Sequence, residues 1–185
     1  MVIESLKNHF LMATPTLSEG FFAGSLTYIC EHNESGAMGI VVNQPLAMNL
    51  DQILEHLDIP HTPKASAPAI LAGGPVQSDH GFVLHNGGSA WDSTLQVAPD
   101  IWLTTSQDVL ADIGKDMGPP QHLIALGYAG WGAGQLEDEL ARNSWLTVPA
   151  STDILFAVPC AERLQAAGQC LGIDIRLLSS AAGHA

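Results

Sequence analysis

Three neighbouring polar residues, Glu31, His32 and Asn33, come directly after an apolar run and shortly before Gly36. Side chains at the end of a strand are often functional, because the sheet holds the loops there in place. His9 lies beside another apolar run and can join this group. A carboxylate next to an imidazole orients the ring for proton transfer, so the group has the chemistry of a general acid–base pair. The sequence therefore offers His9, Glu31 and His32 as catalytic candidates and Asn33 as a ligand-binding candidate.

Strand geometry gives the same residues a second interpretation. Adjacent residues in a strand point to opposite faces, so Glu31 and His32 meet at one ligand only if the backbone leaves the strand there. A turn capped by Asn33 explains the polar cluster without any ligand, and we prefer this interpretation. The catalytic hypothesis requires His32 and either Glu31 or His9 to lie within about 3 Å of a common point in a concave pocket.

The glycine-rich segment 123–139, LIALGYAGWGAGQLEDE, has the order of strand, glycine loop and helix that phosphate-binding loops use. Its spacing fits neither GxGxxG nor an ending in Gly-Lys-Ser or Gly-Lys-Thr, and the helix that follows begins with acidic residues that repel phosphate. Glycine also permits positive φ and lets Tyr128 and Trp131 pack closely against neighbouring backbone. We interpret the segment as a packing device and keep Trp131 as a ligand-binding candidate, because an indole can also stack on a planar ligand.

Two further polar or glycine-rich turns follow predicted strands. Asn43-Gln44-Pro45 combines amide side chains with the fixed φ of proline, and Gly73-Gly74-Pro75 has the composition of a tight strand exit. Both are interpreted first as turns. The alternative is a recognition edge, for which the ligand-binding candidates are Asn43, Gly73 and Gly74.

Other catalytic and metal-binding signatures are missing from the sequence. No GxSxG elbow surrounds Ser89 or Ser106, and no HxH, HExxH or CxxC spacing occurs. We therefore expect no metal site and no cofactor. His80 lies at a turn and is either a surface residue or a polar contact for a ligand. The 3 cysteines are expected to be reduced, partly buried thiols: Cys30, Cys160 and Cys170.

The charge balance restricts the class of partner. The chain has 6 Lys and Arg residues against 19 Asp and Glu residues, which gives a net charge of −13, although only 14% of its residues are charged. A protein that binds nucleic acid or an anionic lipid surface needs clustered lysine and arginine residues to contact the phosphates. The lysine and arginine residues of this chain are scattered singly in the sequence. We therefore expect neither direct DNA or RNA binding nor membrane docking. A basic protein partner would be steered toward such a surface.

The start of the chain, MVIESLKNHFLMATP, lacks a basic region followed by a clean apolar stretch, and no apolar run reaches the roughly 20 residues that span a bilayer. This pattern predicts a cytoplasmic protein. The 185 residues contain no repeat or polar linker, so one domain over 1–185 is expected. The apolar content of 46% also leaves room for a homo-oligomer contact.

Short apolar runs bounded by Gly, Pro or Asn predict more strands than helices. Runs that lie close in sequence favour hairpins, so the sheet is expected to be antiparallel or mixed and the fold class is expected to be α+β. The expected strands are Phe10–Ala13, Phe21–Cys30, Gly39–Val42, Ile70–Ala72, Gly81–His85, Thr94–Val97, Ile101–Thr104, Leu123–Leu126, Trp145–Thr147 and Ile173–Leu177.

Four helices are expected beside this sheet. The clearest follows the N-cap Asn49, with Gln52 placed to complete a capping box. A second follows Ser106 as its N-cap. The remaining two are expected over Gly134–Arg142 and after Pro159.

Long blocks of sequence run through nearly the whole chain: HFLMATP (9–15), FFAGSLTYICEHNESGAMGIVVNQP (21–45), GGPVQSDHGFVLH (73–85), LTTSQDVL (103–110), LIALGYAGWGAGQLEDELARNSWL (123–146) and LGIDIRLLSSAAGHA (171–185). In content and order these blocks resemble the AlgH/YqgE family of bacterial proteins. The resemblance implies an α+β fold with a mixed, largely antiparallel, bifurcated sheet curled into a pseudo-barrel, helices packed outside, and a cytoplasmic location. It implies no established activity, cofactor or catalytic residue, although some members are labelled transcriptional regulators.

Two positions depart from the pattern that the resemblance suggests. His80 stands where many members carry arginine, and Leu164 follows Arg163 where tryptophan is common. The first departure removes support for an anion-binding role of the turn at His80.

Three functional hypotheses remain. The leading one is a non-enzymatic binding or regulatory protein that acts through a protein partner or a small ligand. The alternative is a hydrolase-like enzyme for small molecules that uses the cluster of Glu31 and His32 with His9. A direct DNA-binding regulator is the third, and the net charge of −13 argues against it.

Overall fold

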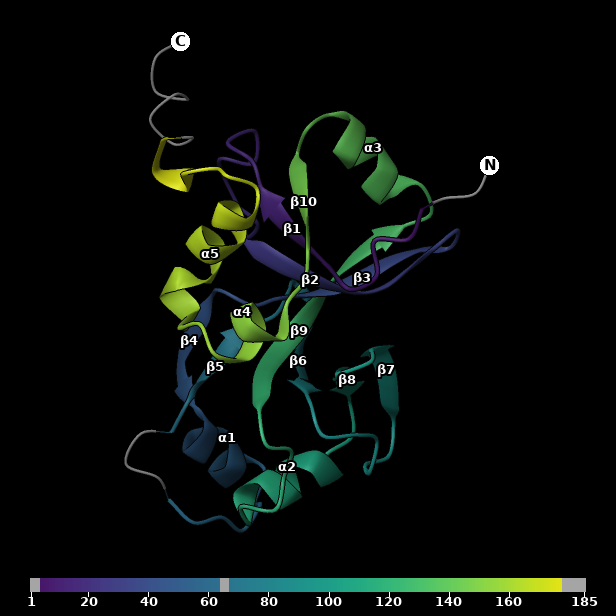
Figure 1. The fold of residues 1–185 in the computed structure, drawn as a ribbon. Helices are drawn as coiled ribbons and strands as arrows, with labels where there is room; N and C mark the ends of the chain where they lie inside the picture. The colour runs from purple at the N-terminus through teal and green to yellow at the C-terminus, as the bar shows by residue number, and fades with distance from the viewer. Residues whose placement is uncertain (1–3, 64–66, 178–185) are drawn as a thin grey trace.

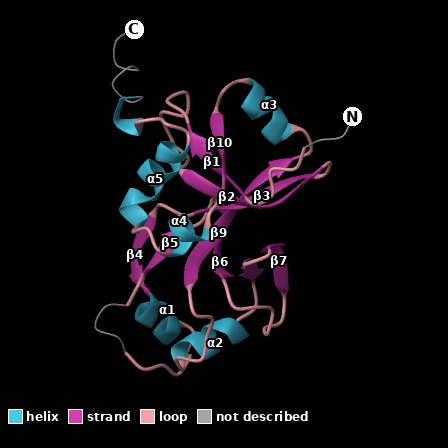
Figure 2. Ribbon diagram, viewed as in Figure 1, coloured by secondary structure: helices cyan, strands magenta, loops and turns pink. Residues whose placement is uncertain are grey.

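The structure is a computed structural model that describes residues 4–63 and 67–177. A branched sheet of ten strands forms the centre of this part of the chain, with helices around it (Figure 1; Figure 2). The strands are β1 (His9–Ala13), β2 (Leu26–Asn33), β3 (Gly36–Val41), β4 (Pro45–Asn49), β5 (Ala69–Ala72), β6 (Val76–His85), β7 (Thr94–Ala98), β8 (Ile101–Thr104), β9 (His122–Gly132) and β10 (Trp145–Pro149). The helices are α1 (Leu50–His56), α2 (Asp108–Gly114), α3 (Gln135–Ala141), α4 (Thr152–Phe156), the 3₁₀ turn η1 (Cys160–Glu162) and α5 (Arg163–Cys170).

Most strands follow one path, β10-β1-β2-β3-β9-β6-β8-β7, in which neighbours are antiparallel. Strands β4 and β5 form a side branch that joins β9 through a parallel β5–β9 ladder. The sheet is therefore mixed but largely antiparallel, and it curls into a half-barrel with helices outside. The expected α+β class and bifurcated sheet are confirmed.

Strand β9 is the place where the sheet divides. One edge of β9 pairs with β6 along 122–128, while the other edge pairs with β5 at 125–126 and with β3 at 129–132. Gly127 lies at the change of partner with a φ of +77°. A Cβ on Gly127 would lie 2.2 Å from the carbonyl oxygen of Gly74, so only glycine fits this crossing.

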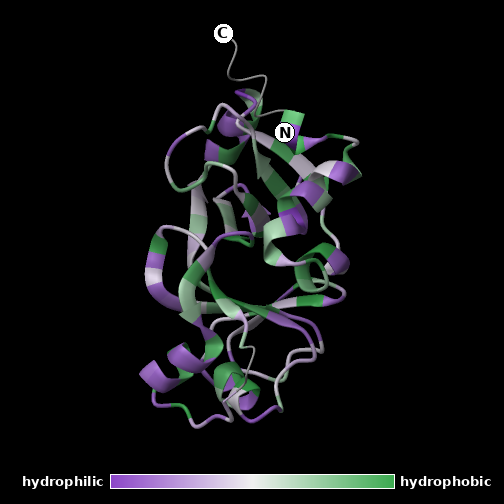
Figure 3. Cartoon of the chain, turned by 90° about the vertical axis from the view of Figure 1, so that its left-hand side faces the viewer, coloured by the Kyte–Doolittle hydropathy of each residue, from purple (hydrophilic) through white to green (hydrophobic). Residues whose placement is uncertain are grey.

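The apolar residues form three clusters, and a different group of helices covers each of them. Helices α4 and α5 lie over the largest cluster, which contains Phe10 and Tyr28. Helices α1 and α2 cover the second, against the part of β9 that contains Ile124. Helix α3 covers the third, which contains Trp131 and Trp145. Figure 3 shows this distribution, with green in the central strands and purple stretches on the outer helices and loops.

The local signals at α1 are confirmed. The side chain of Asn49 accepts a hydrogen bond from Gln52 N, and the Gln52 side chain accepts one from Asn49 N, both at 3.0 Å. The cap expected for α2 is wrong. Helix α2 begins after Gln107, and the hydroxyl of Ser106 donates to Asp92 O and to the Asp108 carboxylate instead of accepting from the helix.

Two expected strands need correction. Strand β2 begins at Leu26, because residues 21–24 turn and Gly24 has a φ of +68°. The segment Ile173–Leu177 is not a strand: residues 175–177 are helical, and Asp174 Oδ1 accepts from the backbone N–H of Arg176.

Other elements are longer than expected or were missed. Strand β9 continues through Gly132, so Gly127, Gly130 and Gly132 belong to the strand, and only Gly134 lies in the turn before α3. Strand β4 lies where only a turn was expected, and helix α4, capped by Ser151, was not expected at all. The helix expected after Pro159 is confirmed as η1 followed by α5, and the helix expected over 134–142 as α3.

None of the helices in the described residues is both long enough and apolar enough to cross a bilayer.

Candidate functional site

His32 on β2 is a buried residue with two hydrogen bonds, and its side chain is only 1% exposed. Its Nδ1 accepts from the backbone N–H of Leu6 at 2.9 Å, so the ring proton resides on Nε2. That nitrogen donates to Glu137 Oε1 at 2.6 Å. The hydrogen bond from His32 lowers the pKa of the Glu137 carboxyl below its ordinary value. The arrangement ties the β2–β3 hairpin to α3, with both ring nitrogens occupied.

The other two catalytic candidates lie elsewhere. Glu31 is exposed, on the face of β2 opposite to buried His32. His9 bonds through Nδ1 to the carbonyl oxygen of Lys7 at 3.1 Å in an exposed position. The convergence that the catalytic hypothesis required is therefore absent, because strand alternation persists through these residues and His32 takes its carboxylate partner from α3.

Asn33 forms the turn that the sequence suggested. Its Oδ1 accepts from the backbone N–H of Ser35 at 2.8 Å, which closes an Asx turn between β2 and β3. Gly36 ends the turn with a φ of +132°, and a Cβ there would lie 2.1 Å from Trp131 O. The side chain of Asn33 is exposed, and its oxygen is engaged within the turn.

Asn43 also has internal partners. Its Oδ1 accepts from Leu26 N at 2.9 Å, and its Nδ2 donates to Gly24 O at 3.0 Å, so the amide fixes the start of β2. Gly73 continues the crossing between the two halves of the sheet: its N–H donates to Leu126 O, and its carbonyl oxygen accepts from Val41 N, both at 2.8 Å.

Gly74 lies so close to β9 that no side chain fits. A Cβ on Gly74 would lie 1.9 Å from the carbonyl carbon of Tyr128. Gly73 is similar, with its Cβ position 2.4 Å from Gly127 O. Both glycines therefore allow two backbone segments to approach each other, which is sufficient reason for their presence.

Trp131 is part of a buried aromatic group under α3. Its side chain packs near Trp145, with ring centroids 6.0 Å apart, and Phe22 contacts both rings. The indole N–H groups of Trp131 and Trp145 both donate to Glu139 Oε2 at 2.8 Å. Two of the acidic residues of α3, Glu137 and Glu139, thus have partners inside the protein.

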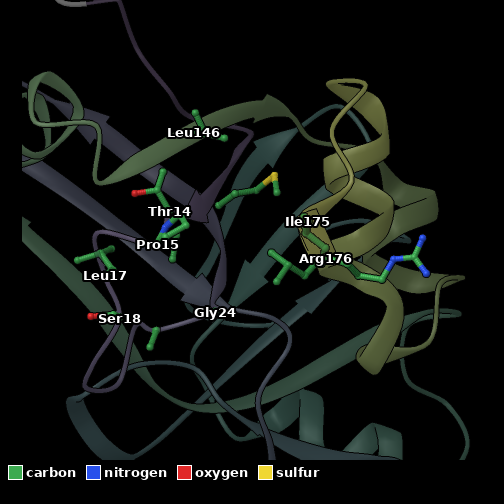
Figure 4. A pocket seen from close by; sticks show the side chains of 12 residues that line it. Thr14, Pro15, Leu17, Ser18, Gly24, Leu146, Ile175 and Arg176 are labelled. Atoms are coloured by element: carbon green, nitrogen blue, oxygen red, sulfur yellow. The ribbon is translucent and has the colours of Figure 1, made fainter. Parts of the chain in front are cut away.

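A pocket with mainly apolar walls lies between the β1–β2 loop and α5, and we call it the loop–helix pocket. Figure 4 shows loop residues such as Pro15 and Leu17 on one side and Ile175 on the other. Its volume is about 480 Å³. It is lined by Met12, Ala13, Thr14, Pro15, Leu17, Ser18, Ala23, Gly24, Leu146, Leu164, Ile175 and Arg176.

Two polar residues that line this pocket, Thr14 and Arg176, already have partners. The Thr14 hydroxyl donates to Asn143 O at 2.6 Å. Arg176 forms an ion pair with Asp174, with Nη2 and Oδ2 2.9 Å apart. The pocket can therefore bind an apolar body through burial of its surface, with little need for charge recognition. Sequence reasoning missed it, because its walls come from segments about 130 residues apart along the chain, such as Thr14 and Leu146.

A second pocket of about 290 Å³ lies between α1, α2 and β6. Ile53 and Leu110 contribute to its apolar wall, and His56, Asp79 and His80 lie at its polar side. His80 is exposed there, which places this sequence candidate on a pocket rim. Within the described residues, no group of His, Cys, Asp and Glu side chains has an arrangement that holds a metal ion.

Arg163 is buried and binds only backbone carbonyl oxygens among the described residues. Its Nη1 donates to Val42 O at 2.6 Å, and its Nε donates to Val158 O at 3.2 Å. Burial lowers the pKa of the guanidinium from its ordinary value. The contact joins the start of α5 to the end of β3 and thereby holds α5 beside the loop–helix pocket.

The three cysteines are free thiols, as expected. Cys30 is buried, Cys160 is half-buried and Cys170 is exposed. Burial raises the pKa of the Cys30 and Cys160 thiols above the ordinary value, so neither has the environment of an activated nucleophile.

Comparison with known proteins identifies the relatives of this chain. A profile of the family described as AlgH-like (DUF179) matches residues 10–176. The chain belongs to this family. A UPF0301 protein of Saccharophagus degradans is 52% identical over 181 residues, which cover 98% of this chain and 89% of that protein. The resemblance to the AlgH/YqgE family is therefore confirmed.

Two solved structures agree with the fold. The solution structure of the AlgH protein from Pseudomonas aeruginosa has 49% sequence identity and a TM-score of 0.80, and the match covers 100% of both chains. A crystal structure of a Corynebacterium diphtheriae protein has a TM-score of 0.74 over 97% of this chain and 94% of that protein. With 18% identity, that second match supports the fold alone.

Proposed function

We propose that the protein is a non-enzymatic, cytoplasmic binding protein with a regulatory role, and that its loop–helix pocket receives a small, largely apolar ligand. The observation that carries this proposal is the pocket itself. Its volume of about 480 Å³ falls within the roughly 300–1,000 Å³ that small-molecule sites occupy. Its walls are mainly apolar, and such walls favour a ligand that loses apolar surface to the protein.

The fate of the chemically reactive candidates supports binding over catalysis. His32 has both ring nitrogens engaged by Leu6 and Glu137. A general base needs a free nitrogen within reach of a substrate proton. Both nitrogens of His32 are already hydrogen-bonded to other residues of the protein. Glu31 and His9 lie away from His32, so the geometry gives no support to the hydrolase-like alternative.

Direct DNA binding gains no support either. The net charge of −13 opposes contact with phosphates, and the buried Arg163 donates to backbone carbonyl oxygens. A regulatory role would therefore act through a ligand or a protein partner. The transcriptional-regulator label that the family resemblance brings is compatible only with such an indirect action.

The pocket can be tested with anilinonaphthalene sulfonate, a probe whose fluorescence rises in apolar sites. We expect saturable binding to the native protein with one site per chain. The variant Leu164→Trp places a larger side chain in the pocket wall and is expected to weaken binding of the fluorescent probe at least tenfold. Leu171→Trp is the matched control, because Leu171 is 39% exposed at the end of the same helix and does not line the pocket.

Equal probe binding by both tryptophan variants would contradict the proposal, provided that near-ultraviolet circular dichroism shows both to be folded. Absence of saturable binding to the wild type, together with no shift in melting temperature across a metabolite screen, would contradict it independently.

A further inference from the structure

Strand β7 is the outermost strand of the sheet path, with β8 as its neighbour on one side (Figure 1). The backbone N–H of Thr105 donates to Ser93 O, which makes residues 93 and 105 a hydrogen-bonded pair. The register continues with Thr94 opposite Thr104 and Leu95 opposite Leu103. Because hydrogen bonding alternates along an antiparallel pair, the backbone N–H and C=O groups of Thr94 and Gln96 point away from β8.

This outer edge lacks two common devices that prevent strand addition, a charged side chain and a proline, although β7 has only 5 residues and its pairing with β8 is irregular between Gln96 and Ala98. The sequence of β7, Thr-Leu-Gln-Val-Ala, has no charged residue and no proline. By contrast, β4 begins at Pro45 and β10 ends at Pro149. Across the part of the chain that the structure describes, no backbone group is bonded to the outward N–H or C=O of Thr94 or Gln96. The edge of β7 is therefore available to pair with a further strand.

A pocket lies beside this edge, between the β7–β8 hairpin and the β2–β3 hairpin. Its volume is about 380 Å³, and Met38, Leu95 and Leu103 give it apolar walls. Glu31 also lines it, and this exposed carboxylate forms no ion pair with any residue that the structure describes. An apolar wall with one carboxylate suits the long stem and charged head of a lysine or arginine side chain.

The part of the chain around β7 carries negative charge, like Glu31. Residues 65–114, which include β5 to α2, contain no lysine or arginine. Exposed Asp92 and Asp100 lie on either side of β7 in sequence. A second copy of this chain would bring another net charge of −13 to the same place, so charge complementarity favours a basic occupant over self-association.

We propose that the edge of β7 binds an extended segment of a basic partner protein by strand addition, with a lysine or arginine of that segment in the pocket beside Glu31. Backbone groups of Thr94 and Gln96 supply the affinity, and the pocket supplies the preference for a basic side chain. This surface is separate from the loop–helix pocket, so the proposal stands whether or not that pocket binds a small ligand.

The test uses the full chain labelled with ¹⁵N and a capped peptide, Val-Thr-Lys-Thr-Val, with Val-Thr-Glu-Thr-Val for comparison. We expect the lysine peptide to shift amide signals of β7 and of the β2–β3 hairpin at millimolar concentration, and to bind at least fivefold more tightly than the glutamate peptide. Leu164→Trp is expected to leave this binding unchanged.

Two pairs of variants locate the contact. Gln96→Pro removes an N–H that β8 does not use and is expected to weaken the lysine peptide at least fivefold, while Gln96→Ala keeps the N–H and has little effect. Glu31→Lys is expected to reverse the preference between the two peptides, and the control Glu34→Lys, in the hairpin turn, leaves the preference as it is.

Three outcomes would overturn the inference. The first is no shift of β7 signals by either peptide in a wild-type protein that is folded. The second is equal binding of the lysine and glutamate peptides. The third is a concentration-dependent dimer in sedimentation that Gln96→Pro abolishes, since that result would assign the edge to a second copy of this chain.

Discussion

The carboxylate of Glu139 holds α3 to the sheet through two indole groups, and this contact gives a quantitative prediction. Trp131 is 6% exposed and Trp145 is 4% exposed, and both N–H groups have Glu139 Oε2 as their acceptor. Loss of a hydrogen bond to a charged group costs roughly 1.5–3 kcal/mol, so two such bonds correspond to roughly 3–6 kcal/mol. Because the donors share one acceptor and water can enter beside an exposed helix, we expect the lower end.

Glu139→Ala is therefore expected to lower the free energy of unfolding by about 3 kcal/mol, a large part of the roughly 5–15 kcal/mol that stabilises a typical domain. For a chain of this size the melting temperature should fall by about 6–12 °C. Urea unfolding followed by circular dichroism measures the first quantity, and tryptophan fluorescence reports the change around the two indoles.

Two further variants serve as controls. Asp138→Ala alters the neighbouring exposed carboxylate, for which the structure gives no side-chain hydrogen bond, and should cost less than about 1 kcal/mol through the helix dipole. Glu139→Gln keeps an oxygen for the indoles and should fall between the two. If Glu139→Ala and Asp138→Ala unfold within about 1 kcal/mol of each other, the reasoning from buried indole donors is refuted.

Three other predictions follow from the packing and the titratable groups. Burial lowers the pKa of His85 from its ordinary 6.5, and the bond from His32 lowers that of Glu137 from 4.5. In both cases the unfolded chain binds the proton more readily than the folded chain, so the melting temperature should fall as pH drops below about 6.5 and again below about 4.5. His85→Gln should reduce the fall in melting temperature below about pH 6.5. Gly74→Ala should cost more than about 3 kcal/mol or prevent folding, whereas Gly81→Ala, with nothing within 4 Å of its Cβ position, should be tolerated in the same urea titration. In the native protein a disulfide reagent should modify exposed Cys170 first, half-buried Cys160 more slowly and buried Cys30 only after unfolding, and rapid loss of all three thiols would contradict the structure.

The parts of the fold that the sequence predicted depend on local chemistry. The capping box of α1 involves Asn49 and Gln52, three residues apart, and both bonds are present. The Asx turn at Asn33 is equally local. Patterns of this kind are visible in a sequence because the interacting groups are neighbours in the chain.

The parts that the sequence did not predict depend on contacts between distant segments. The partner of His32 is Glu137, 105 residues away, so the sequence suggested the adjacent Glu31 instead. Phe21 and Phe22 read as strand residues because they are aromatic, but Phe22 is used to pack against Trp131 and Trp145 from a turn. Tertiary packing therefore overrides the local strand preference at this place.

These internal partners also determine which negative charges remain for another molecule. Glu137 and Glu139 are engaged by His32 and by the two indoles, so the acidic start of α3 is largely committed to folding. On the lobe formed by residues 67–114, Asp112 accepts a hydrogen bond from the indole of Trp91, and Asp108 accepts one from Ser106. The exposed carboxylates of this lobe that have no side-chain hydrogen bond in the described structure are Asp79, Asp92 and Asp100. Among the described strands of that lobe, only β7 has an open edge with a pocket beside it. Glu31 adds its carboxylate to this pocket from the β2–β3 hairpin. Residues 67–114 contain no lysine or arginine to offset these carboxylates, which makes a basic extended segment the partner to test first at β7.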